Sequence, residues 1–158
     1  MTEGWVIRHA SSADAAEIAR LAGLLGYPSD AAAILERLAG MKDGTDHWVA
    51  IATPSMTQRS RSLGGWMHVA RHIALESGQF AELLGLVVDP AARRGGVGRL
   101  LVAEAERWAG AQHLTRLNVR SNAARIESHA FYPALGYMRI KTQHVYSKVL
   151  GEGAGRAI

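Results

Sequence analysis

Residues 81–101 read AELLGLVVDPAARRGGVGRLL, a stretch that joins a strand pattern, a glycine-rich turn and the start of a helix. The apolar run predicts a strand that ends near Val88, and apolar positions return at helical spacing from Val97 onward. No Ser, Thr, Asp or Asn immediately precedes Val97, so this helix lacks the usual side-chain cap. The stretch therefore raises the question of what binds the first backbone N–H groups of the helix.

The turn has the composition of an anion-binding site. The first turn of a helix leaves about four N–H groups unpaired, and the helix dipole places roughly half a positive charge there. The missing side chains of Gly95, Gly96 and Gly98 allow a ligand to approach the backbone closely. Further positive charge comes from Arg93, Arg94 and Arg99.

Three phosphate-binding motifs can be compared with this turn. A P-loop requires Gly-Lys followed by Ser or Thr, but Arg-Leu-Leu follows Gly98. A dinucleotide fingerprint requires a further glycine where Leu101 stands. The pattern Arg/Gln-x-x-Gly-x-Gly/Ala, which binds the pyrophosphate of coenzyme A, is matched in full by residues 93–98. A six-residue pattern is weak evidence by itself, so the alternative is a glycine-rich turn that binds no ligand.

Composition restricts the class of protein. The 158 residues fit one domain, and 48% hydrophobic and 20% charged residues are ordinary for a soluble globular protein. No apolar run approaches the ~20 residues that span a bilayer, and the N-terminal MTEGWVIRHA does not resemble a secretory signal. The absence of cysteine excludes disulfides, a thiol nucleophile and cysteine-based metal sites. We expect a cytoplasmic protein without membrane contacts.

Positive charge is concentrated in the C-terminal half. Lys and Arg number 7 and Asp and Glu number 8 up to Phe80, whereas the counts from Ala81 onward are 11 and 6. This asymmetry suggests an anionic partner, either a phosphorylated cofactor or nucleic acid, with solvated surface arginines as the alternative. Nucleic acid is disfavoured because the arginines gather at a glycine turn and form no stripe with stacking aromatic residues.

Hydrophobic periodicity predicts the order β-α-α-β-β-β-α-β-α-β-β, which implies a mixed sheet with helices on its faces. Ser12 is the expected N-cap of the first helix, and Ser29 or Asp30 that of the second. Gly85 is a candidate β-bulge. The expected strands are 5–10, 47–53, 63–75, 79–88, 114–121 and 136–150 (one bent strand or two short ones), and the expected helices are 13–26, 31–41, 97–108 and 123–132.

From Ala81 to Leu150 the chain resembles the Gcn5-related N-acetyltransferase (GNAT) superfamily. The resemblance rests on AELLGLVVDPAARRGGVGRLL and on SNAARIESHAFYPALGY at 121–137, while the N-terminal half matches more loosely. It implies an α/β (α+β) GNAT-like fold, a mixed, mostly antiparallel sheet of six to seven strands flanked by about four helices. Residues 1–150 would form a single acetyltransferase domain, and 151–158 a flexible tail.

The resemblance also implies an activity. The chain would be an acetyl-CoA-dependent N-acetyltransferase that moves the acetyl group directly to a primary amine, most simply of a small molecule, and a homodimer is common in this family. The alternatives are a non-catalytic acyl-CoA-binding regulatory module and, less favoured, a basic nucleic-acid-binding protein. No metal is expected, because His68 and His72 lie in a strand pattern without a carboxylate partner nearby.

Two residues receive catalytic roles from the resemblance. Tyr132 would donate a proton to the leaving thiolate, whereas packing of the helix on the sheet is its structural alternative. Glu82, eleven residues before Arg93, would remove the amine proton, whereas a solvated carboxylate is the alternative. Pro133 departs from the family pattern, in which a helix-tolerant residue is more usual after the tyrosine. Proline cannot donate to the carbonyl of His129 and disfavours helical geometry at the preceding residue, so we expect the helix to kink or end here.

The remaining expected residues concern the cofactor. Asn122 would bind its pantetheine arm or cap the helix that follows, and Arg125 would meet phosphate or solvent. His129 would hold the Tyr132 phenol or relay a proton or, more simply, pack in the interior. Backbone groups on a splayed strand end would bind the pantetheine amides. The full cofactor-binding set is Leu86, Val87, Val88, Arg93, Arg94, Gly95, Gly96, Val97, Gly98, Arg99, Asn122, Arg125 and Tyr132.

Overall fold

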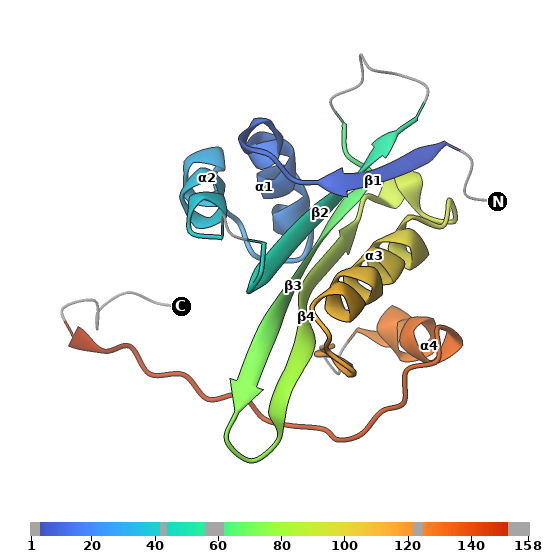
Figure 1. Ribbon diagram of the computed structural model, residues 1–158. Helices are drawn as coiled ribbons and strands as arrows, with labels where there is room; N and C mark the ends of the chain where they lie inside the picture. The colour runs from blue at the N-terminus through green and yellow to red at the C-terminus, as the bar shows by residue number, and fades with distance from the viewer. Residues whose placement is uncertain (1–3, 42–43, 56–61, 122–124, 152–158) are drawn as a thin grey trace. The chain divides into compact units, whose positions relative to one another are not determined.

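The computed structural model describes residues 4–41, 44–55, 62–121 and 125–151. The chain divides into two compact units, Met1–Arg120 and Ser121–Ile158. The first unit holds five strands and three α-helices, and the second holds one helix (Figure 1). The elements are β1 (Trp5–His9), η1 (Ser12–Asp14), α1 (Ala15–Leu24), α2 (Ala31–Ala39), β2 (His47–Pro54), β3 (Gly65–Ala74), β4 (Gly78–Val88), η2 (Pro90–Ala92), α3 (Val97–Ala111), β5 (Leu117–Val119) and α4 (Ile126–Ala134), where η is a 3-10 turn.

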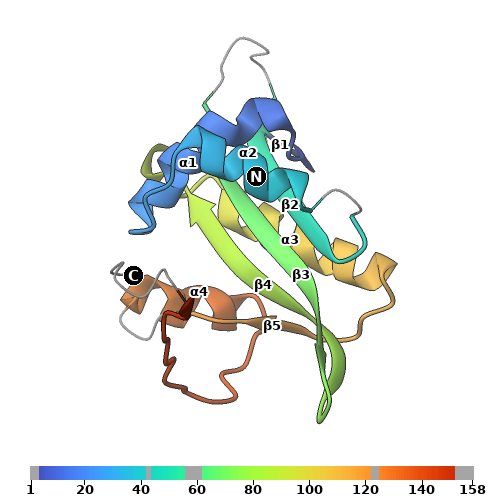
Figure 2. The same ribbon diagram turned by 90° about the vertical axis from the view of Figure 1, so that its left-hand side faces the viewer.

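The sheet has the strand order β1-β2-β3-β4-β5 (Figure 2). Neighbouring strands from β1 to β4 are antiparallel, and β5 runs parallel to β4. The tight hairpin between β3 and β4 is closed at Gly78, whose φ of +75° suits glycine. The mixed, mostly antiparallel sheet and the α/β class predicted from the sequence are therefore confirmed, although the described residues form five strands and not six or seven.

Helices cover both faces of this sheet. On one face α1 and α2 pack on a cluster that includes Ile51 and Val87, and α3 lies on the other face (Figure 1). The approach of α3 depends on Gly65, because a Cβ there would lie 2.4 Å from the Val87 carbonyl oxygen and 3.1 Å from a Leu101 methyl. Burial of these apolar surfaces is the main stabilising contribution to the unit.

A β-bulge in β4 sets which side chains share a face. His68 pairs with Gly85 and Val69 pairs with Leu83, so one extra residue, Leu84, interrupts the ladder. The bulge predicted near Gly85 is confirmed. Because of the bulge, Glu82 and Gly85 lie on the same face of the sheet. Strict alternation over three residues would place them on opposite faces.

The first helix begins differently from the prediction. Ser12 does not cap it; Ser11 precedes the 3-10 turn instead, and its N–H donates to Asp14 Oδ2 at 2.8 Å. Asp14 is buried and accepts two hydrogen bonds of 2.9 Å from Arg8. Burial alone would raise the pKa of Asp14, but the bonds from Arg8 and Ser11 outweigh it and hold that pKa below its ordinary value. Asp30 caps the second helix as predicted.

The second unit corrects two predictions. Its helix α4 begins at Ile126 with Arg125 as N-cap, so it starts later than the expected residue 123. The segment 137–150 forms no strand, and most of its apolar side chains are exposed. Alternating β-branched and aromatic residues record only a local preference, whereas a strand also requires a hydrogen-bonding neighbour. Within the described ranges, no helix is long and apolar enough to cross a membrane.

Candidate active site

The glycine turn leads into α3 without a side-chain cap, as predicted. Gly96 is the N-cap residue in a left-handed conformation (φ +78°), and no side chain bonds to the first amides. Leu100 N–H makes the first helical bond, to the Gly96 carbonyl at 3.0 Å. The N–H groups of Val97, Gly98 and Arg99 therefore precede the hydrogen-bonded ladder and are available to a ligand.

Side chains around the turn separate into two groups. The arginines at positions 93, 94 and 99 are exposed, whereas Val97 is 1% exposed and packs in the core. Val97 can thus contribute only its backbone to a ligand. Arg94 holds a φ of +72°, which is uncommon for a residue with a side chain. Two left-handed residues in this short turn, Arg94 and Gly96, set the direction in which the chain enters α3.

Trp5 supports the turn from the first strand. A Cβ at Gly95 would lie 3.0 Å from Trp5 Nε1 and 3.2 Å from the Ala92 carbonyl oxygen, so only glycine fits without displacement. The Gly95 N–H donates to that carbonyl at 3.2 Å. Trp5 was not predictable from the sequence, because its proximity to the turn arises only from the pairing of distant strands.

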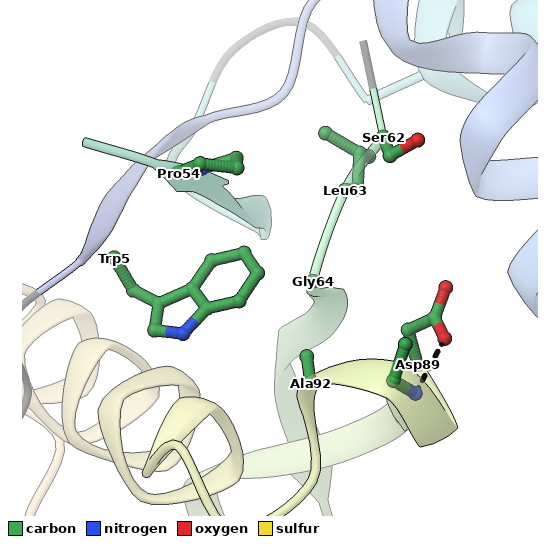
Figure 3. A pocket seen from close by; sticks show the side chains of 8 residues that line it. Trp5, Pro54, Ser62, Leu63, Gly64, Asp89 and Ala92 are labelled. Carbon is green, nitrogen blue, oxygen red and sulfur yellow. Dashed lines mark hydrogen bonds between the residues drawn. The ribbon is translucent and has the colours of Figure 1, made fainter. Parts of the chain in front are cut away.

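A shallow pocket of about 220 Å³ lies beside the turn (Figure 3). Its lining joins the first strand, the end of β2, the start of β3 and the turn η2. The lining residues are Trp5, Pro54, Ser62, Leu63, Gly64, Asp89, Ala91 and Ala92. In Figure 3 the Trp5 ring extends along one side and the Asp89 carboxylate stands at the other.

An ion-pair network fixes the start of the turn to α1. Arg20 Nη2 donates to Asp89 Oδ2 at 2.8 Å and Arg20 Nε to Glu17 Oε2 at 2.5 Å. Glu17 also accepts from the Leu63 N–H at 3.1 Å. The hydrogen bond from the Ala91 N–H, followed by that from Arg20, lowers the pKa of Asp89. This network was not predicted, since nothing in the local sequence links positions 20 and 89.

Toward its C-terminal end, β4 is paired on one edge only within the described residues of the first unit. The parallel strand β5 pairs with β4 only from Ala81 to Leu83, whereas β3 continues to pair with β4 up to Val88. The edge beyond the bulge, which includes Leu86, Val87 and Val88, therefore has no strand partner among the described residues of this unit. Val87 is buried, so its backbone is the part that a ligand can reach.

Glu82 is buried and has two charged or titratable neighbours. It is 5% exposed, in contrast to a solvated carboxylate. Arg120 Nε pairs with its Oε1 atom, and His72 Nδ1 lies 3.6 Å from Oε2. Neither neighbour was selected from the sequence. The parallel register of β4 and β5, which pairs Glu82 with Asn118, brings Arg120 to this position, and that register is a tertiary property.

Tyr132 lies in α4 of the second unit. Its ring meets Phe131 at 5.0 Å and Tyr137 at 5.9 Å between centroids, both edge to face. Burial raises the pKa of the Tyr132 phenol, and the charge of Arg125 acts in the opposite direction. The helix ends at Ala134, one residue after Pro133, in agreement with the prediction that the proline stops or kinks it.

The other predicted residues of this unit differ in exposure where the structure describes them. His129 is exposed, so the expectation that it packs in the interior is wrong. Arg125 is half-buried beside the start of α4. Asn122 lies outside the described residues. In the first unit, His68 Nε2 lies 3.0 Å from His47 Nδ1. The described part of the chain contains no cluster of three or more potential metal ligands.

Comparison with known proteins extends this picture. Residues 38–137 match the model of the acetyltransferase (GNAT) family. No curated protein matches the sequence at a significant level.

Several solved structures share the fold. The chain is similar to the aminoglycoside N-acetyltransferase AAC(6')-Iy in complex with CoA, with a TM-score of 0.78 and 18% identity over 91% of this chain and 94% of that one. It is similar to aminoglycoside 6'-N-acetyltransferase AAC(6')-Ih from Acinetobacter baumannii, with a TM-score of 0.76 and 21% identity over 94% and 100% of the two chains. The glucosamine-6-phosphate N-acetyltransferase from Arabidopsis thaliana gives 0.76 and 16% over 92% and 99%.

Proposed function

Since the chain belongs to the acetyltransferase (GNAT) family and is an acyltransferase, we propose that it transfers an acetyl group from acetyl-coenzyme A to the primary amine of a small molecule. The observation that carries this proposal is the glycine turn, where the uncapped amides of Val97, Gly98 and Arg99 precede the first helical hydrogen bond. Backbone N–H groups at a helix start, flanked by arginines, suit a diphosphate.

The residues of the turn fit coenzyme A. A diphosphate would accept from the amides of residues 96–99 and meet the exposed side chains of Arg93, Arg94 and Arg99. The free edge of β4 at residues 86–88 would bind the amides of the pantetheine arm, as an added strand does. We assign Asn122 and Arg125 to the same arm and phosphate, respectively. When bound, acetyl-CoA supplies an activated acetyl thioester.

Glu82 and Tyr132 are the proposed base and acid. A protonated amine must lose a proton before its nitrogen can attack a carbonyl carbon, and Glu82 would take that proton. The new N–C bond forms as the C–S bond breaks, and the departing sulfur takes the phenol proton of Tyr132. Transfer is direct, because no cysteine is present to form an acyl-enzyme.

A small-molecule acceptor is supported by the structural neighbours. Two of the three neighbours described above are aminoglycoside acetyltransferases and the third is a glucosamine-6-phosphate acetyltransferase. All three are named for small amines. The low identities establish the shared fold, so this choice of acceptor class is part of our proposal.

Calorimetric titration with acetyl-CoA tests the cofactor assignment. We expect Arg99→Gln to weaken binding about tenfold, because a charge-assisted hydrogen bond contributes roughly 1.5–3 kcal/mol. Arg37→Gln removes an equally exposed arginine from α2 and should leave binding unchanged. Absence of binding heat for the wild-type protein would overturn the proposal.

Thiol release with a panel of amines tests the transfer itself. Tyr132→Phe should lower kcat about 100-fold while the Kd for acetyl-CoA stays constant, since general acid catalysis contributes at least this factor. Tyr146→Phe is the matched control, because this phenol is 90% exposed in the same unit. Binding of acetyl-CoA without thiol release for any amine would indicate the regulatory module, and an unchanged kcat in Tyr132→Phe would remove the tyrosine from the chemistry.

A further inference from the structure

The surroundings of Glu82 pose a problem for a base at this position. A carboxylate that is 5% exposed has little contact with water, yet a base must release its proton after every turnover. Arg120 pairs with Oε1 and stabilises the charged carboxylate. Because Glu82 has little contact with water, a proton that it takes up needs a route to solvent.

His72 is placed to provide that route. Its Nδ1 atom lies 3.6 Å from Glu82 Oε2, and its side chain is 46% exposed whereas that of Glu82 is 6% exposed. The two residues lie on the same face of the sheet, because Ala70 pairs with Glu82 and His72 with Phe80. The imidazole thus joins the buried carboxylate to water.

The imidazole is also held in position. Its ring meets that of Phe80 at 4.8 Å between centroids with a tilt of 40°. Arg116 Cζ lies over the Phe80 ring, 4.7 Å from the ring centroid. Of the charged groups described around His72, Glu82 faces it directly. Arg120 contacts the Glu82 carboxylate, and Arg116 contacts the Phe80 ring. Among the residues that the structure describes, the carboxylate in direct reach of His72 is that of Glu82, the proposed base.

We infer that His72 is a positioning residue that carries the amine proton from Glu82 to solvent, an inference that rests on the proposed function. The amine N–H bond breaks as the proton joins Glu82 Oε2. That O–H bond then breaks as His72 Nδ1 takes the proton and becomes an imidazolium, which releases a proton to water from its exposed ring. Imidazole is the side chain that exchanges protons with water near neutral pH. The separation of 3.6 Å between His72 Nδ1 and Glu82 Oε2 closes to hydrogen-bond distance with a small side-chain movement.

The test is steady-state kinetics of His72→Gln with and without added imidazole. We expect kcat to fall about 100-fold, because proton transfer by a positioned side chain contributes roughly 10²- to 10⁴-fold. The KM for acetyl-CoA should not change, and free imidazole should restore kcat in proportion to its concentration. A residue with a purely structural role would not respond to added imidazole. His9→Gln, which lies on the opposite face of the sheet and stacks on Trp48, should retain full activity and show no imidazole effect.

The outcomes separate this inference from the proposed function. If the wild-type protein releases no thiol with any amine, the proposed function fails and this inference fails with it. If the wild-type protein is active and His72→Gln keeps its kcat, or loses kcat without recovery in imidazole while its thermal unfolding matches the wild type, the inference alone is overturned.

Discussion

Acid should destabilise the first unit through His68. His68 lies against His47, with 3.0 Å between Nε2 and the His47 Nδ1 atom. Burial, and secondarily the charge of His47, lowers the pKa of His68 from 6.5 to about 4. The folded protein therefore binds a proton less readily than the unfolded chain, and the stability contributed by neutral His68 is lost as the pH falls from about 6.5 to about 4.

The size of this effect follows from the shift. With one pKa unit equal to about 1.4 kcal/mol, the loss amounts to roughly 2 kcal/mol between pH 7 and pH 5 and to about 3 kcal/mol at pH 4. Urea unfolding at pH 7 and pH 5 measures it. Because other groups also titrate, the quantity of interest is the difference in pH dependence between the wild-type protein and His68→Gln, whose amide can still pair with His47.

We expect the wild-type protein to lose about 2 kcal/mol more than His68→Gln over this pH interval. Equal losses in the two proteins would refute the reasoning, since they would show that His68 has the same proton affinity in the folded and unfolded states.

Three further predictions concern backbone and charge. Gly65→Ala should lower the free energy of unfolding by about 3 kcal/mol in urea titrations, because its Cβ would lie 2.4 Å from the Val87 carbonyl oxygen. Gly96→Ala should lower the free energy of unfolding by about 1 kcal/mol, because the φ of +78° disfavours a side chain, and should weaken acetyl-CoA binding in calorimetry. Gly23→Ala lies inside α1 with open space around it and should have neither effect. Asp14→Asn should have a lower free energy of unfolding than the wild type at pH 7. This difference should decrease as the pH falls through the lowered pKa of Asp14, because protonation of the wild-type carboxylate removes the same charge. Equal differences in the free energy of unfolding at pH 7 and pH 3 would contradict this.

The sequence by itself determined the glycine turn and much of the fold. Three glycines and the absence of a capping side chain before Val97 are local features, and local backbone chemistry fixes what they do. The hairpin between β3 and β4, the bulge near Gly85 and the stop after Pro133 were predictable for the same reason. The 137–150 segment was mispredicted because strand residues express a preference that only a neighbouring strand can realise.

The tertiary structure alone decided the surroundings of the predicted residues. Glu82 was selected from its distance to Arg93, but its burial and its contacts with His72 and Arg120 arise from strand register and a bulge. The support of Gly95 by Trp5 has the same origin, since it joins residues that are ninety positions apart. Chemical type and local spacing are written along the chain, whereas proton affinity, exposure and neighbours depend on which distant segments pack together, and that packing is a property of the whole fold.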